Sequence, residues 1–237
     1  MTGPPVGPRM APAWPYSRGR RNECGLEIVI LPAGGGDELL VTGGDGNRVP
    51  WDWSADGRSI LGAYCHDNEG CRHLICLFPI SAAPNAENEM QVLASDPERD
   101  LWNARFSPDG RWICFSATKL GSSSPSTIYA MPSSGGERTR ITDDKEWSDK
   151  PRWSQDGKMI YFVSNRVTGF LNVWAICFDQ AAGKPVGEPF QVTKYESPGK
   201  MVWPDLTKMY ISLGGGRLIL PIVESSGGIW MLENVDD

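Results

Sequence analysis

Histidine is scarce in this sequence, and long hydrophobic runs are absent. Only 2 histidines occur among 237 residues, so the side chain that most often acts as a base or metal ligand is nearly missing. No apolar stretch approaches the roughly 20 residues of a membrane-spanning helix, and no secretory signal is visible at the start. The net charge of −6 argues against a nucleic-acid surface, which normally carries a basic patch. We therefore expect neither a membrane span nor a nucleic-acid partner.

Recognisable catalytic motifs are also missing. The Gly-x-Ser-x-Gly motif of serine hydrolases does not occur, and neither do the His-Arg-Asp and Asp-Phe-Gly motifs of protein kinases. The glycine runs at 34–36 and 43–46 lack the Gly-Lys-Ser/Thr ending of a phosphate-binding loop. A sugar-cleaving enzyme would need clustered carboxylates, and Glu146 and Asp149 are the one close pair expected in loops. The sequence thus predicts no enzymatic activity, no catalytic residues and no cofactor.

One short stretch combines cysteine with both histidines. Cys65, His66, Cys71, His73 and Cys76 lie close together, and thiolate with imidazole at short spacing can bind zinc. On a strand, however, Cys71 and His73 would face one side and Cys76 the other. A disulfide from Cys65 to Cys71, in an exported protein, and ordinary core cysteines are the alternatives. We expect no metal site.

Glycine, proline and tryptophan are abundant, with 27, 19 and 10 copies, as suits short strands, tight turns and large rings between sheets. One phrase, aromatic-Ser-x-Asp-Gly-Arg/Lys, recurs about every 50 residues, and an apolar run follows each copy. Asp-Gly tolerates the left-handed backbone of a tight hairpin turn. The copies are Trp53–Arg58, Phe106–Arg111 and Trp153–Lys158, with the structural turn residues Asp56, Gly57, Asp109, Gly110, Asp156 and Gly157.

A second strand pair follows each hairpin, which gives four antiparallel strands per repeat. That unit is the blade of a β-propeller, so the predicted fold is all-β with about four and a half blades. The proline- and arginine-rich residues 1–24 are predicted to be a flexible tail, because they cannot bury enough apolar area to order themselves. The propeller is expected over residues 25–237, with blades at about 26–42 (partial), 49–95, 101–142, 150–193 and 208–237.

These phrases resemble the WD-like repeats of TolB-like propellers, which centre on aromatic-Ser-Pro-Asp-Gly-Lys/Arg. The copy Phe106–Arg111 matches fully, and the strand endings Ile141–Thr142 and Val192–Thr193 also fit. Residues 228–235 are similar to the ends of propellers fused behind bacterial serine/threonine kinases or regulators. The resemblance covers residues 26–237 and implies part of a propeller with roughly six blades. Its compartment, bacterial periplasm or cytoplasm, is left open.

Binding is expected on the loops that join strands within and between blades, because variable loops on a rigid scaffold carry function. The predicted function is a non-catalytic protein-binding or scaffold module with a protein partner. The alternative is a regulatory or sensor propeller detached from a bacterial serine/threonine kinase or a peptidase. A plainer interpretation is that the loop tryptophans cap the core. The candidate binding residues are Trp51, Trp102, Glu146, Trp147, Asp149, Arg166 and Phe170.

Overall fold

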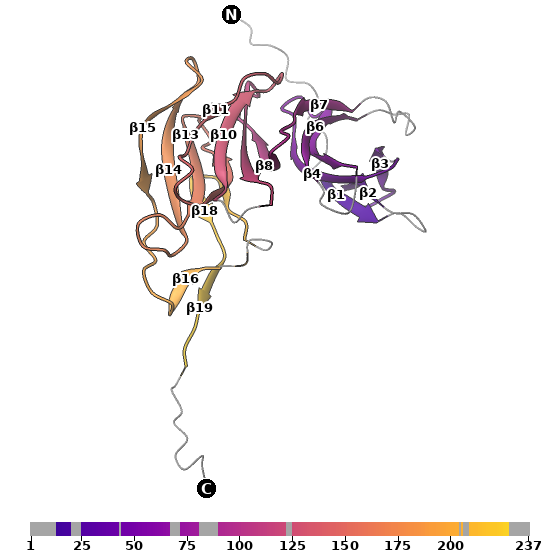
Figure 1. Cartoon of the computed structure of the whole chain (residues 1–237). Helices are drawn as coiled ribbons and strands as arrows, with labels where there is room; N and C mark the ends of the chain where they lie inside the picture. The colour runs from indigo at the N-terminus through magenta and orange to yellow at the C-terminus, as the bar shows by residue number, and fades with distance from the viewer. Residues whose placement is uncertain are drawn as a thin grey trace, which may run out of the picture.

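The computed structural model describes residues 13–19, 25–42, 44–66, 72–80, 90–121, 125–203, 205 and 209–227. Every regular element in these ranges is a β-strand, and they contain no helix that could cross a membrane. Figure 1 shows the strands gathered into sheets that stand side by side. The all-β fold predicted from the sequence is confirmed.

Three sets of four strands follow one another along the chain, and in each set neighbouring strands pair antiparallel in chain order. This is the arrangement expected of propeller blades. The first blade has β4 (Asn47–Trp53), β5 (Ser59–Cys65), β6 (Leu74–Pro79) and β7 (Gln91–Ala94). The second has β8 (Arg99–Phe106), β9 (Trp112–Lys119), β10 (Thr127–Pro132) and β11 (Thr139–Arg140). The third has β12 (Ser148–Trp153), β13 (Met159–Ser164), β14 (Asn172–Asp179) and β15 (Lys184–Gln191).

The chain begins with three further strands, β1 (Ala13–Gly19), β2 (Leu26–Pro32) and β3 (Leu39–Thr42), with β1 and β3 both paired to β2. The prediction of a flexible tail is wrong for β1, and the rest of residues 1–24 lies outside the described residues. Two factors hold the strand: its backbone pairs with β2 along its whole length, and Arg18 forms ion pairs with Glu27 and Glu38. Neither factor shows in local composition.

The last described strands form two small pairs. β17 (Ser212–Gly214) and β18 (Arg217–Ile219) make a hairpin whose turn, Gly215–Gly216, has φ of 56° and 70°. Glycine adopts such angles without strain, which suits this pair to the turn. β19 (Ile222–Glu224) then pairs with β16 (Lys200–Val202). Residues 228–237, the end of the last expected blade, lie outside the described residues.

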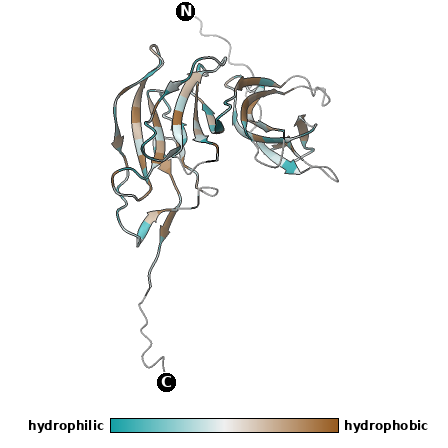
Figure 2. Cartoon of the chain, in the orientation of Figure 1, coloured by the Kyte–Doolittle hydropathy of each residue, from teal (hydrophilic) through white to brown (hydrophobic). Residues whose placement is uncertain are grey.

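The hydrophobic core fills the spaces between adjacent sheets. Leu61 and Ile75 of the first blade pack with Leu101 and Phe115 of the second, and a similar cluster around Phe162 joins the second blade to the third. The second strand of each blade is therefore covered on both faces, which explains its unbroken apolar run. Figure 2 shows hydrophobic residues concentrated on the strands and hydrophilic ones on the connections.

Candidate binding site on the inner strands

The repeated phrase forms the same turn in all three blades. In the second blade, the Ser107 hydroxyl donates to Asp109 at 2.5 Å and accepts from the backbone N–H of Trp112 at 2.9 Å. Asp109 also accepts from the Arg111 N–H, and Gly110 has a φ of 71°. The first and third blades repeat these bonds from Ser54 and Ser154, with glycine φ of 69° in both. The turn fixes where each inner strand ends.

The strands that precede these turns lie innermost. β8 contacts both β4 and β12, and β12 contacts β17, whereas the last strands of the three blades have no comparable mutual contacts among the described residues. Figure 1 shows β8 beside β4 in the middle of the chain. Side chains on the inner strands of neighbouring blades therefore meet near the propeller axis.

Each inner strand carries a β-bulge a few residues before its turn. The register with the second strand slips by one residue between Pro50 and Asp52, between Trp102 and Arg105, and between Asp149 and Arg152. Asn103 and Lys150 occupy equivalent bulge positions and have φ of 55° and 57°. Non-glycine residues adopt such angles at a cost, and bulges with strained residues concentrate where a strand presents a side chain for function.

A charged residue follows each bulge, immediately before the aromatic residue of the phrase: Asp52, Arg105 and Arg152. Asp52 accepts backbone N–H bonds from Trp53 at 3.0 Å and from Phe106 of the next blade at 2.9 Å. Burial raises the pKa of this carboxyl, while the positive charge of Arg105 opposes the rise. The innermost strands thus hold a partly buried carboxylate near two partly buried arginines.

Neither arginine forms an ion pair with another described residue, although Asp52 lies near both. Among the described residues, neither guanidinium has a carboxylate within 4.0 Å, and Arg105 Nη1 is buried without a hydrogen-bond acceptor. Arg152 donates to the carbonyl of Pro151 at 2.8 Å. Burial, followed by repulsion from Arg105, lowers the pKa of Arg152 to about 10. A guanidinium keeps its proton at physiological pH, so the lowered pKa expresses first the cost of removing this cation from water and then the cost of placing it near Arg105.

Lys150 adds a third cation and is 7% exposed. Its ammonium lies 5.4 Å from the centre of the Tyr210 ring, and burial lowers the pKa of the amine. The adjoining Asp149 carboxylate is already occupied, because it accepts from Ser116 Oγ at 2.5 Å and Asn103 Nδ2 at 3.1 Å. We call Asp52, Arg105, Lys150, Arg152 and Tyr210 the inner-strand cluster.

Three of the predicted loop residues lie in strands instead. Trp51 is in β4, Trp102 in β8 and Asp149 in β12, because the inner strands begin earlier than the apolar pattern indicates. The ring centres of Trp51 and Trp102 are 6.5 Å apart, and the ring of His73 lies 3.8 Å from that of Trp102, tilted by 45°. The two tryptophans continue along the inner strands from the cluster.

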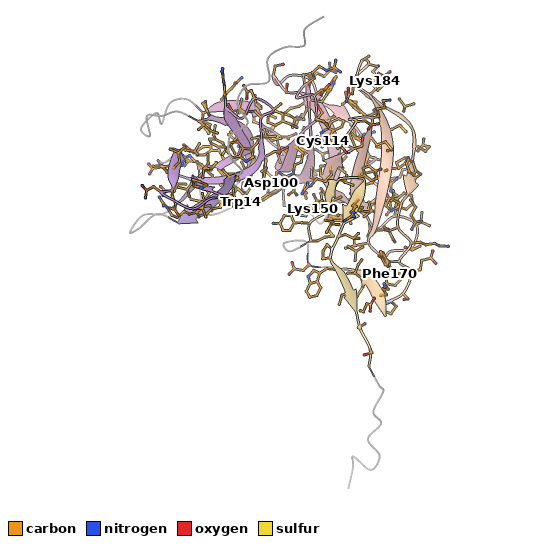
Figure 3. The ribbon with its side chains drawn as sticks, turned by 180° about the vertical axis from the view of Figure 1, so that it is seen from behind. Trp14, Asp100, Cys114, Lys150, Phe170 and Lys184 are labelled. Carbon is orange, nitrogen blue, oxygen red and sulfur yellow. The ribbon has the colours of Figure 1, made fainter. Side chains whose placement is uncertain are left out.

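The other predicted residues lie outside the inner strands. Arg166 extends over the rings of Phe162 and Trp174, with Asp143 at 3.8 Å. Figure 3 shows Phe170 toward the outside of the molecule, whereas Lys150 and Asp100 lie near its middle. The structure therefore divides the predicted set into two groups, of which the second comprises Glu146, Trp147, Arg166 and Phe170.

His73 and Asp100 resemble part of a catalytic triad. His73 Nδ1 lies 2.9 Å from an Asp100 oxygen, and Trp102 Nε1 donates to the other oxygen. Among the described residues no serine, threonine or cysteine contacts the ring of His73. Because the Asp100 carboxylate also accepts the backbone N–H of His73 at 2.7 Å, the pair joins the first blade to the second.

The described cysteines lie in different environments. Cys65 is disulfide-bonded, and its partner lies outside the described residues. Cys76 is free, and burial raises the pKa of its thiol to about 12. The described ranges contain no group of three histidine, cysteine or acidic side chains that could hold a metal ion.

Arg105 and Arg152 are the residues that sequence reasoning missed. A charged side chain next to a turn is usually solvated, so each one alone carries no signal. The signal appears when the three copies of the phrase are compared. The residue before the aromatic one is charged in every copy, although positions on the inner strands near the axis are largely removed from water. Aligning the copies and asking which positions meet at the axis would have found them.

No family model matches the chain. An uncharacterized protein of Agrobacterium fabrum is 34% identical over 140 residues, which is 58% of this chain and 42% of that protein. The uncharacterized peptidase YuxL of Bacillus subtilis is 36% identical over 63 residues, or 27% of this chain and 9% of the peptidase. The chain thus spans less than half the length of these curated relatives.

Solved propeller structures resemble this chain more widely. TolB of Acinetobacter baumannii has a TM-score of 0.52 at 21% identity, over 84% of this chain and 46% of TolB. A puromycin-hydrolyzing peptidase of Mycobacterium tuberculosis has a TM-score of 0.64 at 15% identity, over 90% of this chain and 35% of the peptidase. The chain has the all-β architecture of TolB and peptidase propellers.

These comparisons correct one prediction from the sequence. We expected no enzymatic activity because no catalytic motif is visible, but peptidases occur both among the sequence relatives and among the similar structures, which include prolyl endopeptidases. The motif search failed for a physical reason: a propeller domain carries turn and strand motifs, whatever chemistry accompanies it. The prediction is therefore wrong.

Proposed function

We propose that this chain is the peptide-binding propeller of a peptidase-type protein. The observation that carries the proposal is the inner-strand cluster, where three cations of the inner strands β8 and β12 lie near the exposed ring of Tyr210, in a fold found in peptidases. An extended peptide offers what such a surface recognises: ionised groups, backbone hydrogen-bonding groups and apolar side chains.

The strands beside the cluster extend this surface. Trp51 and Trp102 are both half-buried and lie next to each other on adjacent blades. Tryptophan side chains contribute strongly to binding because they bury much area with little loss of conformational freedom. In this proposal the two tryptophans contact peptide side chains, and the negative charge of Asp149 holds the neighbouring Lys150 in place.

Short peptides labelled with fluorescein at the amino end, with randomised sequence, test the proposal. Anisotropy of the dye reports binding to the purified chain, and mass spectrometry of the same samples reports cleavage. We expect saturable binding in the micromolar range, about −8 kcal/mol. Replacing Trp51 or Trp102 by alanine should weaken it tenfold or more. Peptides that are neither bound nor cleaved would contradict the proposal.

A second candidate is a protein-binding or scaffold module of the TolB kind. Val186 and Phe190 on the outer strand β15 are 54% and 47% exposed, and exposed apolar residues on an edge strand invite a partner. A propeller fused to a kinase is a variant of this candidate, although residues 228–237, which suggested it, lie outside the described residues. Replacing Phe190 by lysine should abolish binding of a partner protein and leave peptide binding unchanged.

A further inference from the structure

We propose that Arg105 and Arg152 bind a single carboxylate, in particular the ionised carboxyl end of a peptide. The inference rests on the proposed function, because it names the end of the peptide that the inner strands hold. No motif in the sequence and no similar protein assigns this role to the two residues.

The first support is the set of unused hydrogen-bond donors. A guanidinium has five N–H donors, and buried donors normally have acceptors. Arg105 Nη1 has none among the described residues, and Arg152 donates only to the neighbouring carbonyl of Pro151 there. A carboxylate accepts two parallel bonds from a guanidinium, which is the strongest pairing available to either group.

The second support is the balance of charge. Three cations (Arg105, Lys150 and Arg152) lie near two carboxylates (Asp52 and Asp149), which leaves one positive charge. Both carboxylates already accept other hydrogen bonds, so they leave N–H donors of the two arginines without an acceptor. One carboxylate neutralises the excess, whereas a phosphate group, with about −1.5 to −2 charges, would exceed it.

The third support is the built backbone around the charges. The bulges hold Asn103 and Lys150 at φ of 55° and 57°, and bulges of this kind are often found where a strand presents a side chain for function. Tyr210 lies at the open side, 54% exposed and beside Lys150. Its ring would pack on the side chain of the last peptide residue, and Trp51 and Trp102 would contact residues before it.

The test compares two forms of one peptide mixture. Randomised short peptides carry fluorescein at the amino end and end either in a free carboxylate or in an amide. We expect the purified chain to bind the free acids at least tenfold more tightly than the amides. Amidation replaces one carboxylate oxygen by a neutral NH₂ group and changes nothing else in the peptide, so the difference isolates recognition of the carboxyl end.

Variants assign the difference to the two arginines. Arg105→Met and Arg152→Met keep much of the apolar volume, and each should bring the affinities for acid and amide within twofold of each other. The matched control is Arg111→Met. Arg111 lies in the same blade as Arg105, is exposed in the turn and pairs with Asp109, so this variant should keep the full difference. Circular dichroism and the unfolding midpoint show that each variant is folded.

The outcomes separate the two proposals. If acid and amide bind equally well, or if the arginine variants keep the difference, the carboxylate site is wrong while the peptide-binding propeller stands. If neither form binds, both are wrong. If inorganic phosphate competes as well as acetate at equal concentration, the site is not selective for a single charge and the assignment to carboxylate fails.

Discussion

At the turn end of the inner strands the three blades carry the same residues, whereas a few residues upstream, after the bulge, they carry different ones. Serine, aspartate and glycine recur in each turn and bond to one another. The position before the aromatic residue is Asp52 in the first blade and arginine in the next two. The two regions are close together, and both the turn and the bulge recur in all three blades.

The difference separates what builds a blade from what distinguishes one blade from another. The serine and aspartate of each turn find their hydrogen-bond partners within a few residues of the chain, so the same residues can form the turn in every blade. The charges after the bulges are partly buried, form no ion pair with a neighbouring residue of their own strand, and meet charges of neighbouring blades. An asymmetric ligand needs such asymmetry at the axis, which a ring of identical inner strands would lack.

The largest effect we expect concerns the opposite end of the first blade, where β5 ends in the disulfide-bonded Cys65. Breaking this crosslink frees the unfolded chain, so Cys65→Ser should lower the free energy of unfolding by about 3 kcal/mol. Urea unfolding with and without reductant measures it.

The control for the disulfide is Cys177→Ser, because Cys177 is free and exposed and its loss should change little. Peptide mapping by mass spectrometry then identifies the partner as Cys24 or Cys71, the two cysteines outside the described residues. A wild-type midpoint that does not respond to reductant would show that the crosslink contributes nothing, and that the shared turn alone holds the first blade.

The next effect tests the shared turn itself. Ser107→Ala should lower the free energy of unfolding by about 2 kcal/mol, since the Trp112 N–H loses its acceptor and Asp109 loses a donor. Ser107 is 2% exposed, while the equivalent Ser54 is half-buried, so Ser54→Ala should cost less. Equal losses at both positions would mean that burial does not govern the turn.

The bulge region should respond with the opposite sign. Arg152→Met removes a buried cation from beside another, so it should raise the free energy of unfolding by about 1 kcal/mol, even though it abolishes the proposed carboxylate site. Arg111→Met, in the exposed turn, should leave stability within about 0.5 kcal/mol of wild type. A marked loss of stability in Arg152→Met would show that this arginine builds the blade rather than the site.

The contrast also explains what could be predicted from the sequence. Asp109 and Gly110 act locally, so their turn, and the glycine pair at Gly215–Gly216, could be placed from neighbouring residues. β1 depends on the edge of β2, and the inner-strand cluster depends on which blades adjoin; both are relations between distant segments. Trp51 and Trp102 were singled out as large side chains, but their place on the inner strands needed the fold.

The smallest effect distinguishes the carboxylates of the two regions by their pH dependence. The hydrogen bonds from Ser54 and Ser154 lower the pKa of Asp56 and Asp156. Their contribution to stability is therefore present above the ordinary pKa near 3.8 and is lost as pH falls below it. Burial instead raises the pKa of Asp52, so its contribution is lost as pH rises from that ordinary value through the raised one.

Asp52→Asn should therefore abolish the decline on the neutral side and keep the loss in acid, a change of below about 1 kcal/mol in the pH profile. Arg105 and Arg152 stay charged throughout this range, so the shape of the profile comes from the carboxylates. Asp156→Asn is the matched control and should reduce only the acid loss. Urea unfolding from about pH 3 to about pH 7 measures all three profiles. If the Asp52→Asn profile parallels that of wild type on the neutral side, the pKa of Asp52 is not raised. The inner strands then differ from the turns in sequence but not in electrostatics.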